Sequence, residues 1–384
     1  MSRDSYRGSF RTHCTECARS NSVRLPNYGP LRISGLENDF NNCYCNAVLQ
    51  ALYPLSSFRE RMIYMKNSTS EISSALGKLY ELCDSPRGTD MQCWPPFCSG
   101  VQSPADLLQR ICNKNAAFVM GEQQDAHEFL TCLINSINEE IQAIERRWEE
   151  ARFSFISRRH ALHAIEDGYT FVLPPRRTWL SKLLEGTLLL ETTCHMCEQV
   201  SSVVEPFLTL SVEIFEACNV ERCLQRYSDW ELLTGPNQYF CRMCNGHRDA
   251  SRRSLFNTLP PVFMIHLKRF KFNPLVCLNT NNTYGYCYNR LPHYVVSNRN
   301  ITLTDLHHAD PMTYELFAII CHIGSSPHFG HYVAFTHVEG HWYRCDDENA
   351  TAICNISAEL GDENTYGNPF SYILFYKLKS LTNI

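Results

Sequence analysis

The sequence of 384 residues lacks several features that would place it in a specialised class of protein. It contains no run of about 18 apolar residues, which excludes a conventional membrane-spanning helix. The first residues, "MSRDSYRGSF", are polar, so a secretory signal peptide is not expected. The net charge is −5, and Lys and Arg are spread along the chain without the basic stripe that is typical of nucleic-acid binders. The sequence therefore predicts a globular protein with no membrane and no nucleic acid among its partners.

Cysteine, in contrast, is abundant, with 20 residues in the chain. In a protein without a secretory signal, cysteines are expected to stay reduced, and some are then available as metal ligands or as nucleophiles. We therefore expect the protein to be located in the cytoplasm, the nucleus or both.

The chain up to about residue 150 has the periodicity of helices. Val48, Leu52 and Leu55 follow one another at i, i+4 and i+7, which predicts an amphipathic helix that begins near Cys43 and stops around Pro54. A second, longer helix is predicted to start near "GEQQDAHEFL", because apolar residues recur every three or four positions after it. Its buried face is expected to comprise Leu130, Ile134, Ile137, Ile141, Ile144 and Trp148.

The pattern changes between Glu149 and Arg177, where the helical periodicity breaks and "LPPRR" is typical of a linker. Alternating apolar and polar residues follow, which predict strands. These stretches are "SSVVEPFLTLSVEI", "PVFMIHLKRFKF", "YELFAIICHIG", "HYVAFTHV", "HWYRCDD" and "FSYILFYKL". The predicted fold class is therefore α+β, with a helical lobe followed by an antiparallel β region.

Two Cys-x-x-Cys pairs have the arrangement of a structural metal site. Each pair supplies two thiolates from one tight turn, which is half of a tetrahedral zinc shell. Turns at the ends of two β-hairpins would bring together, around a structural Zn²⁺, the sulfurs of Cys194, Cys197, Cys241 and Cys244. The alternatives are four reduced thiols without a metal, and a redox pair. A third pair, Cys14 and Cys17, has no second half and stays unassigned.

Cys43 and Cys45 lie where a polar turn meets the first predicted helix. Cys43 falls in the first helical turn, where unpaired backbone N–H groups and the positive end of the helix dipole favour an anion, and therefore a nucleophilic thiolate. Cys45 projects from a different face and lacks this advantage. Asn38, shortly before Cys43, is a candidate donor of a hydrogen bond to the oxyanion of the reaction. The alternative for Cys43 is a buried small apolar side chain.

A general base is expected near the other end of the chain, in "GHYVAFTHVEGHWYRCDDENA". A hairpin in this stretch would place His331 opposite Asp346, within reach of a hydrogen bond that fixes the imidazole tautomer. A two-residue turn at 339–340 would instead shift the partner of His331 toward Glu348. Asp347 is expected to face away from Asp346, toward the loop or the oxyanion side. The competing histidines are His328, His337 and His341.

These motifs occur in a single order, and as a set they resemble the catalytic domain of the ubiquitin-specific proteases. The resemblance covers about residues 33 to 378 and rests on "NNCYCNAVLQALY", "QQDAHEF", the paired Cys-x-x-Cys, "HLKRF", "GHY" and "YILFY". Within that family the sequence is most similar to the small subgroup activated by WD-repeat proteins. The resemblance implies a papain-like cysteine protease fold after a polar N-terminal extension of residues 1–32. A helical thumb would occupy about 33–180, and an antiparallel β palm with zinc-bearing β fingers would occupy about 181–384.

The resemblance also implies roles for individual residues. The protein would be a deubiquitinating cysteine protease that cleaves ubiquitinated proteins after the C-terminal Gly of ubiquitin, through a thioester on Cys43. His331 would be the general base, Asp346 its orienting acid and Asn38 the oxyanion donor. WD-repeat proteins would be activating partners, and the substrate-binding residues would be Gln124, Asp125 and Tyr332.

One stretch departs from the family pattern. Where Gly-Asn-Thr-Cys is usual, this chain has Phe40-Asn41-Asn42-Cys43. A Phe in place of a Gly with positive φ predicts a strained Phe40 or a rearranged loop, with Asn38 mis-aimed. Two alternative functions stay open: a catalytically silent ubiquitin-binding scaffold, which this departure favours, and a protease for another ubiquitin-like modifier, because the chemistry at the modifier's tail is shared.

Overall fold

The structure is a computed structural model of the chain. The predicted N-terminal extension with Cys14 and Cys17, the "LPPRR" linker up to residue 176, and His328 lie outside the described residues. The described residues are 33–84, 100–160, 177–216, 218–272, 288–308, 310–326, 329–354, 356–357 and 370–379.

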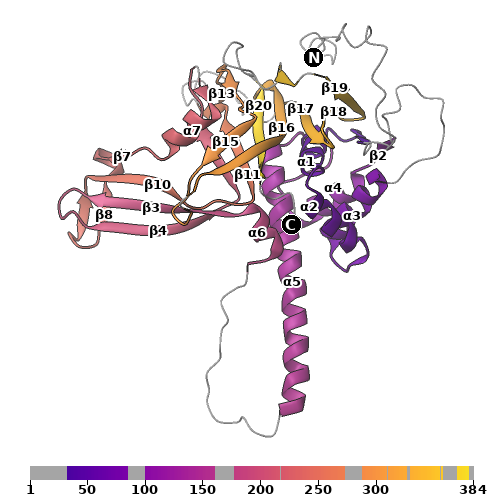
Figure 1. Ribbon diagram of the computed structural model, residues 1–384, viewed down its shortest axis with the longest axis horizontal. Helices are drawn as coiled ribbons and strands as arrows, with labels where there is room; N and C mark the ends of the chain where they lie inside the picture. The colour runs from indigo at the N-terminus through magenta and orange to yellow at the C-terminus, as the bar shows by residue number, and fades with distance from the viewer. Residues whose placement is uncertain are drawn as a thin grey trace.

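The helices of the first half form one lobe, which we call the thumb (Figure 1). None of the helices in the described part of the chain has the length and apolar character needed to span a bilayer. The elements of the thumb are β1 (Gly35–Leu36), α1 (Cys43–Leu52), α2 (Ser56–Tyr64), η2 (Met65–Asn67), α3 (Glu71–Asp84), β2 (Val101–Gln102), α4 (Ala105–Lys114), α5 (Ala126–His160) and α6 (Trp179–Leu184).

Helix α1 has the predicted bounds but not the predicted single buried face. All ten of its residues are buried, because the helix packs against α5 on one side and against strands β16 and β17 on another. Even the polar residues Asn46 and Gln50 are buried, where they donate to backbone carbonyls of the segment before the helix. Val48, Leu52 and Leu55 are buried as expected, but the opposite side of α1 does not face solvent as the side of an amphipathic surface helix would.

Helix α5 begins where predicted and runs further than predicted. Asp125 caps it, with its Oδ1 atom accepting the backbone N–H groups of His127 at 2.7 Å and Glu128 at 3.2 Å. The helix was expected to break at Glu149 but continues to His160, and Figure 1 shows its last turns extending away from the rest of the molecule. Leu130, Ile134, Ile137 and Ile141 are buried, whereas Trp148 is 68% exposed, which contradicts its predicted burial.

The second half of the chain supplies most of the strands. Its elements are β3 (Gly186–Cys194), β4 (Val200–Phe207), β5 (Thr209–Glu213), β6 (Cys218–Asn219), α7 (Val220–Tyr227), β7 (Glu231–Leu233), η3 (Gly235–Asn237), β8 (Tyr239–Cys241), β9 (Gly246–Arg248), β10 (Ala250–Thr258), β11 (Val262–Lys268), β12 (Phe270–Phe272), β13 (Tyr288–Arg290), β14 (Val295–Val296), β15 (Asn300–Leu303), β16 (Met312–Ser326), β17 (Phe329–Val338), β18 (His341–Asp346), β19 (Asn349–Ile353) and β20 (Ser371–Leu378).

The largest sheet, the palm, has eight strands in the order β19-β18-β17-β16-β20-β11-β5, with β15 also paired to β16. Both faces of the palm are buried. Along β20, Ile373 and Phe375 belong to the core shared with the thumb, whereas Leu374 and Tyr376 belong to a second core on the other face. This two-sided burial explains why "YILFY" is almost entirely apolar, because neighbouring residues of a strand point to opposite faces.

The fingers are a four-stranded sheet of order β4-β3-β10-β7 with the β8–β9 hairpin at its end, and they project from the palm in Figure 1. Their connection to the palm explains one departure from an antiparallel palm, since β5 and β11 pair in parallel. Strands β4 and β10 are both antiparallel to β3, so they run in the same direction. Strand β5 continues β4 and β11 continues β10, and the two therefore enter the palm side by side in one direction.

Candidate active site

The thumb and the palm meet at the first residue of α1. Helix α1 packs on β17, the strand that carries His331, and this contact brings Cys43 against the imidazole. Cys43 is 4% exposed, and a hydrogen bond joins its thiol to His331. Because the other ring nitrogen, Nε2, contacts Asp346, Nδ1 is the nitrogen left for the sulfur. The structure thus brings the predicted nucleophile and base together from opposite ends of the chain.

His331 and Asp346 are in contact, but through a different register from the one predicted first. The distance from Nε2 of His331 to Oδ1 of Asp346 is 2.6 Å. The turn of this hairpin has two residues, Glu339 and Gly340, both with positive φ, so Val338 pairs with His341. That register does not place His331 opposite Asp346. The two side chains meet diagonally across the strands, as long side chains on one face of a sheet can.

Arg344 is a neighbour of this pair that the sequence reasoning missed. Its Nη2 atom donates to Oδ2 of Asp346 at 2.7 Å, so both carboxylate oxygens of Asp346 have a partner. The alternation of a strand was a usable signal, because residues two apart share a face. The contact fixes the carboxylate that in turn holds the imidazole of His331.

The electrostatics of the site favour a charged imidazole. Burial lowers the pKa of His331, but hydrogen bonds to Asp346 and Cys43 outweigh burial and raise it to about 10. Burial likewise opposes ionisation of Asp346, yet the hydrogen bond to His331 and the nearby Arg344 bring the net pKa of Asp346 below its ordinary value. An imidazolium held between a carboxylate and a sulfur is the partner that a nucleophilic thiolate requires.

Asn38 lies in the loop before α1, with its side chain engaged at both ends. Its Nδ2 atom donates to Oδ2 of Asp347 at 2.6 Å, and its Oδ1 atom accepts the backbone N–H of Asn42 at 2.7 Å. The backbone N–H of Asn38 donates to Oε1 of Glu348 at 3.0 Å. Asp347 therefore faces the loop, as predicted. Glu348, which was the alternative partner of His331, accepts a hydrogen bond from this loop instead.

Two further asparagines complete this network. Asn46 donates to Oδ1 of Asp347 at 2.9 Å, and Asn42 donates to the carbonyl of Glu37 at 2.9 Å. The buried position of Asp347 raises its pKa, with the hydrogen bonds from Asn46 and Asn38 opposing that rise. Sequence reasoning did not assign Asn42 and Asn46, and their signal was the unusual density of asparagine around Cys43.

The expected strain at Phe40 does not occur. The residue with positive φ in this loop is Asn41, at 54°, and Asn tolerates the left-handed region far better than Phe. The backbone N–H of Phe40 donates to Oδ1 of Asn42 at 3.1 Å. The left-handed residue of the loop is therefore Asn41, and the backbone of Phe40 is not strained.

The competing residues lie elsewhere. Burial raises the pKa of Cys45 well above its ordinary value, so this thiol stays protonated inside the core. His337 packs against Trp342 with the two rings tilted and their centroids 5.2 Å apart, and His341 is exposed at the turn of the hairpin. His331 is thus the histidine of this hairpin that faces Cys43.

The predicted substrate-binding residues lie together beside the catalytic pair. Tyr332 follows His331 on β17, is buried, and lies 6.0 Å from Tyr372 between ring centroids. The hydroxyl of Tyr372 donates to Oδ2 of Asp125, which joins the start of α5 to β20. Gln124 is half-buried next to Asp125.

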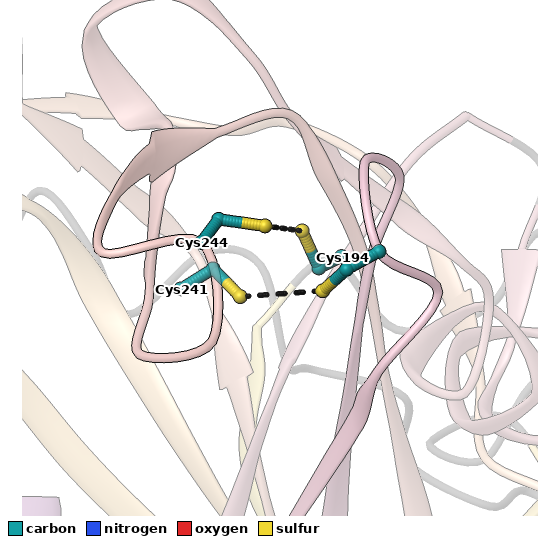
Figure 2. Close-up of side chains that lie close together, drawn as sticks. Cys194, Cys241 and Cys244 are labelled. Atoms are coloured by element: carbon teal, nitrogen blue, oxygen red, sulfur yellow. Dashed lines mark hydrogen bonds between the residues drawn. The ribbon is translucent and has the colours of Figure 1, made fainter.

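The four cysteines of the paired motifs form one cluster at the end of the fingers. Cys194 and Cys197 lie at the β3–β4 turn, and Cys241 and Cys244 lie at the β8–β9 turn. Figure 2 shows the labelled Cys194 facing Cys241 and Cys244. The Sγ–Sγ distance is 4.0 Å from Cys194 to Cys244 and 3.6 Å from Cys197 to Cys241, and all four sulfurs lie within 4.8 Å of one another. Ligands about 2.3 Å from a tetrahedral zinc would be about 3.8 Å apart. The cluster therefore fits a metal ion.

The chemistry of the donor set agrees with this geometry. Hydrogen bonds from the backbone N–H groups of Cys197 and Met196 and from the neighbouring thiols outweigh burial and lower the pKa of the Cys194 thiol to about 7, which favours the deprotonated sulfur that a metal needs. The pairs sit at the ends of hairpins, as predicted, and four sulfur ligands leave no position for a substrate.

A thiol, an imidazole and a carboxylate in hydrogen-bonded sequence, held between a helical lobe and a β-sheet, are the arrangement of a thiol-dependent hydrolase. Residues 34–376 match the family described as ubiquitin carboxyl-terminal hydrolase. The chain belongs to this family, and the predicted family is confirmed. Its place in the subgroup activated by WD-repeat proteins stays a prediction.

Two relatives show the extent of the match. The chain is 32% identical to "Ubiquitin carboxyl-terminal hydrolase 12" of Salmo salar, over 89% of this chain and 89% of the relative. It is 30% identical to "Ubiquitin carboxyl-terminal hydrolase 4" of Arabidopsis thaliana, over 90% of this chain and 93% of the relative. Among solved structures, the chain is similar to Ubp8 in the SAGA Ubp8/Sgf11/Sus1/Sgf73 DUB module bound to ubiquitin aldehyde. That match has a TM-score of 0.64 at 20% identity and covers 94% of this chain and 72% of the other. At this identity the likeness supports the fold, and the predicted α+β fold class is confirmed.

Proposed function

We propose that the protein is a deubiquitinating cysteine protease that hydrolyses the bond after the C-terminal Gly of ubiquitin. The observation that carries this proposal is the hydrogen-bonded series from Cys43 through His331 to Asp346, in a chain of the ubiquitin carboxyl-terminal hydrolase family. A scaffold without activity would not need a base and an orienting acid aligned on a buried thiol.

The geometry supports a two-step mechanism. The Cys43 sulfur attacks the carbonyl carbon of the terminal Gly, and His331 gives its proton to the departing lysine amine. Water then attacks the thioester with His331 as the base, and the free carboxylate of ubiquitin leaves. Asp346 keeps Nε2 of His331 occupied, so that Nδ1 faces the sulfur and the substrate throughout.

Asn38 is the proposed oxyanion donor. Its Nδ2 atom carries two hydrogens, of which one is given to Asp347, so the second remains for the developing oxyanion. Asn46 supports this arrangement from the other oxygen of Asp347. An amide held in advance by a fixed carboxylate needs little reorganisation during the reaction.

The tail of ubiquitin is proposed to bind between α5 and the palm, at Gln124, Asp125 and Tyr332. Asp125 offers a carboxylate that accepts N–H groups: in the free protein its Oδ1 atom caps α5, and its Oδ2 atom accepts the hydroxyl of Tyr372. Tyr332 and Tyr372 are both buried here, with ring centroids 6.0 Å apart, and we propose that they pack along a tail whose last residues, Gly-Gly, have no side chains.

The cysteine cluster is proposed to hold a structural Zn²⁺ through Cys194, Cys197, Cys241 and Cys244. The ion would join the β3–β4 turn to the β8–β9 turn, and so stiffen the end of the fingers. It supplies no part of the reaction at Cys43.

The fingers also support the proposal of a protein partner, such as the WD-repeat activators predicted from the sequence. Large apolar side chains are exposed on them, among them Met196 at 72% and Met243 at 73%, next to the cysteine cluster. Exposed apolar residues that gather on one part of a surface are typical of protein-binding sites. Others on the fingers are Val200, Val203, Val204, Trp230, Leu232 and Phe240.

Reaction with ubiquitin that carries a C-terminal electrophile tests the activity directly. We expect a covalent adduct of one ubiquitin, mapped to Cys43 by mass spectrometry, that is lost in Cys43→Ser and kept in Cys45→Ala. The protonated thiol of Cys45 is buried in the core and offers no nucleophile. Binding of ubiquitin without an adduct, also after addition of a WD-repeat protein, would favour the silent scaffold. An adduct only with another modifier would redirect the proposal to that modifier.

The pH dependence of kcat/KM provides a second test. Since the pKa of His331 is raised to about 10, the imidazolium persists as pH rises, and activity is expected to fall only in the strongly alkaline range. In Asp346→Asn the hydrogen bond that raises this pKa is weakened, and the alkaline limb should move to lower pH by about one unit or more. An alkaline limb at the same pH in both proteins would contradict this assignment of Asp346.

A further inference from the structure

The pairing of β16 with β17 is interrupted directly before His331. Ile323 pairs with His331 and Ser326 pairs with Phe329, so two residues of β16 lie opposite the single residue Gly330. This is a β-bulge, which leaves one residue out of the regular ladder and turns the side chains beside it. The bulge therefore sets the direction in which His331 leaves the strand.

Gly330 is held from two sides. Its backbone N–H donates to Oε1 of Gln123 at 3.1 Å, across the boundary between thumb and palm. On its other side, a Cβ atom at position 330 would lie 2.3 Å from Nε2 of His322 and 2.8 Å from the carbonyl oxygen of Ile323. His322 is completely buried, so its ring has no space to move aside. Only a glycine therefore fits at position 330.

Gln123 is itself well placed to act as the fixed partner. Two residues later, Asp125 caps α5 and accepts the hydroxyl of Tyr372, so the segment 123–125 is joined to β17 and to β20. Within the described chain, the side-chain amide oxygen of Gln123 is the acceptor that the backbone N–H of Gly330 uses. A side chain without an acceptor would leave this backbone N–H without its partner, and the bulge could then relax.

We infer that Gln123 is a positioning residue for the reaction: by accepting the N–H of Gly330, it fixes the bulge that aims His331 at Cys43 and Asp346. This inference rests on the proposed hydrolase function and adds a residue that acts through the backbone rather than on the substrate. Gln123 would thereby couple the placement of the thumb segment before α5 to the alignment of the base on the palm.

The test uses the full chain with Gln123→Met, which keeps the length of the side chain and removes the acceptor, and Gln123→Glu, which keeps an acceptor oxygen. The adjacent exposed residue supplies the matched control, Glu122→Met. Hydrolysis of a ubiquitin C-terminal fluorogenic amide gives kcat and KM. Affinity for ubiquitin is measured separately for each variant in a Cys43→Ala background.

We expect Gln123→Met to lower kcat about 10- to 100-fold, as for a misplacement of about 1 Å at a catalytic group, with little change in KM or in affinity for ubiquitin. Its alkaline limb should move to lower pH, because His331 is held less firmly against Asp346. Gln123→Glu should recover most of kcat, and Glu122→Met should behave as the wild type.

Several results would overturn the inference. An unchanged kcat in Gln123→Met would show that the bond is not needed, and a loss confined to KM and affinity would make Gln123 a substrate contact instead. A Glu variant as impaired as the Met variant would contradict the acceptor role. Failure of the wild type to hydrolyse the substrate or to form the adduct would refute the proposed function itself, and is thus distinguishable from these outcomes.

Discussion

Replacing His331 with glutamine is expected to lower kcat/KM for a ubiquitin C-terminal amide by about 10³-fold, within the range of general acid–base catalysis. Glutamine can form hydrogen bonds but cannot carry the proton that passes from Cys43 to the leaving amine. The hydrogen bonds of His331 to Cys43 and Asp346 are those that this step uses. The measurement is steady-state hydrolysis of the fluorogenic amide, with the adduct reaction as a second readout.

His341→Gln provides the matched control, because His341 lies on the same hairpin but is exposed at its turn. It should retain wild-type kinetics. Circular dichroism and ubiquitin binding should be unchanged in both variants. If His331→Gln kept more than about a tenth of the activity, well outside the range for loss of a general base, the assignment of His331 would be wrong.

Removal of the proposed Zn²⁺ is expected to unfold the fingers while the palm and thumb remain folded. Structural zinc sites contribute on the order of 10 kcal/mol in isolated zinc-finger peptides at neutral pH. The β8–β9 hairpin has three residues in each strand and is tied to the β3–β4 turn by the cysteine cluster. The palm keeps its own two cores, which do not include the cluster. The loss of folded structure should therefore be confined to the fingers.

Hydrogen exchange with and without a strong chelator measures this effect, and metal analysis should give about one equivalent of zinc, as for a single Cys₄ site. Cys241→Ala should reproduce the effect of the chelator, with faster exchange in β3, β8 and β10. Cys112→Ala, in α4 and far along the chain from the cluster, is the matched control and should exchange as the wild type. A protein that contains no zinc and has unchanged exchange in chelator would refute the metal proposal.

Local signals in the sequence were sufficient for the elements that carry the site. The start of α1 at Cys43 and its end before Pro54 followed from helix periodicity and a helix-breaking residue. The strands β11, β16, β17, β18 and β20 followed from their apolar, β-branched and aromatic composition. The paired Cys-x-x-Cys motifs followed from ligand spacing, because two thiolates from one turn form half of a zinc site.

The register at the site was less accessible. The alternation of the hairpin allowed two turns, and the pairing of His331 directly with Asp346 was the wrong one, since Glu339 and Gly340 form a two-residue turn. A shift of one residue in a turn changes every cross-strand pair, and the strand sequences fit both registers. The contact was nonetheless predicted correctly, because a diagonal approach gives the same hydrogen bond.

By itself the sequence determined the chemistry that is available: a cysteine at a helix start, a histidine and acids on a hairpin, and four thiols in two turns. Only the tertiary structure decided that Asp347 holds Asn38, that Gln123 holds Gly330, and that β5 runs parallel to β11. The physical reason is that helix and strand signals are local, set by neighbours a few residues apart. Hydrogen bonds between the thumb and the palm depend instead on how two lobes pack, which no short stretch of the chain records.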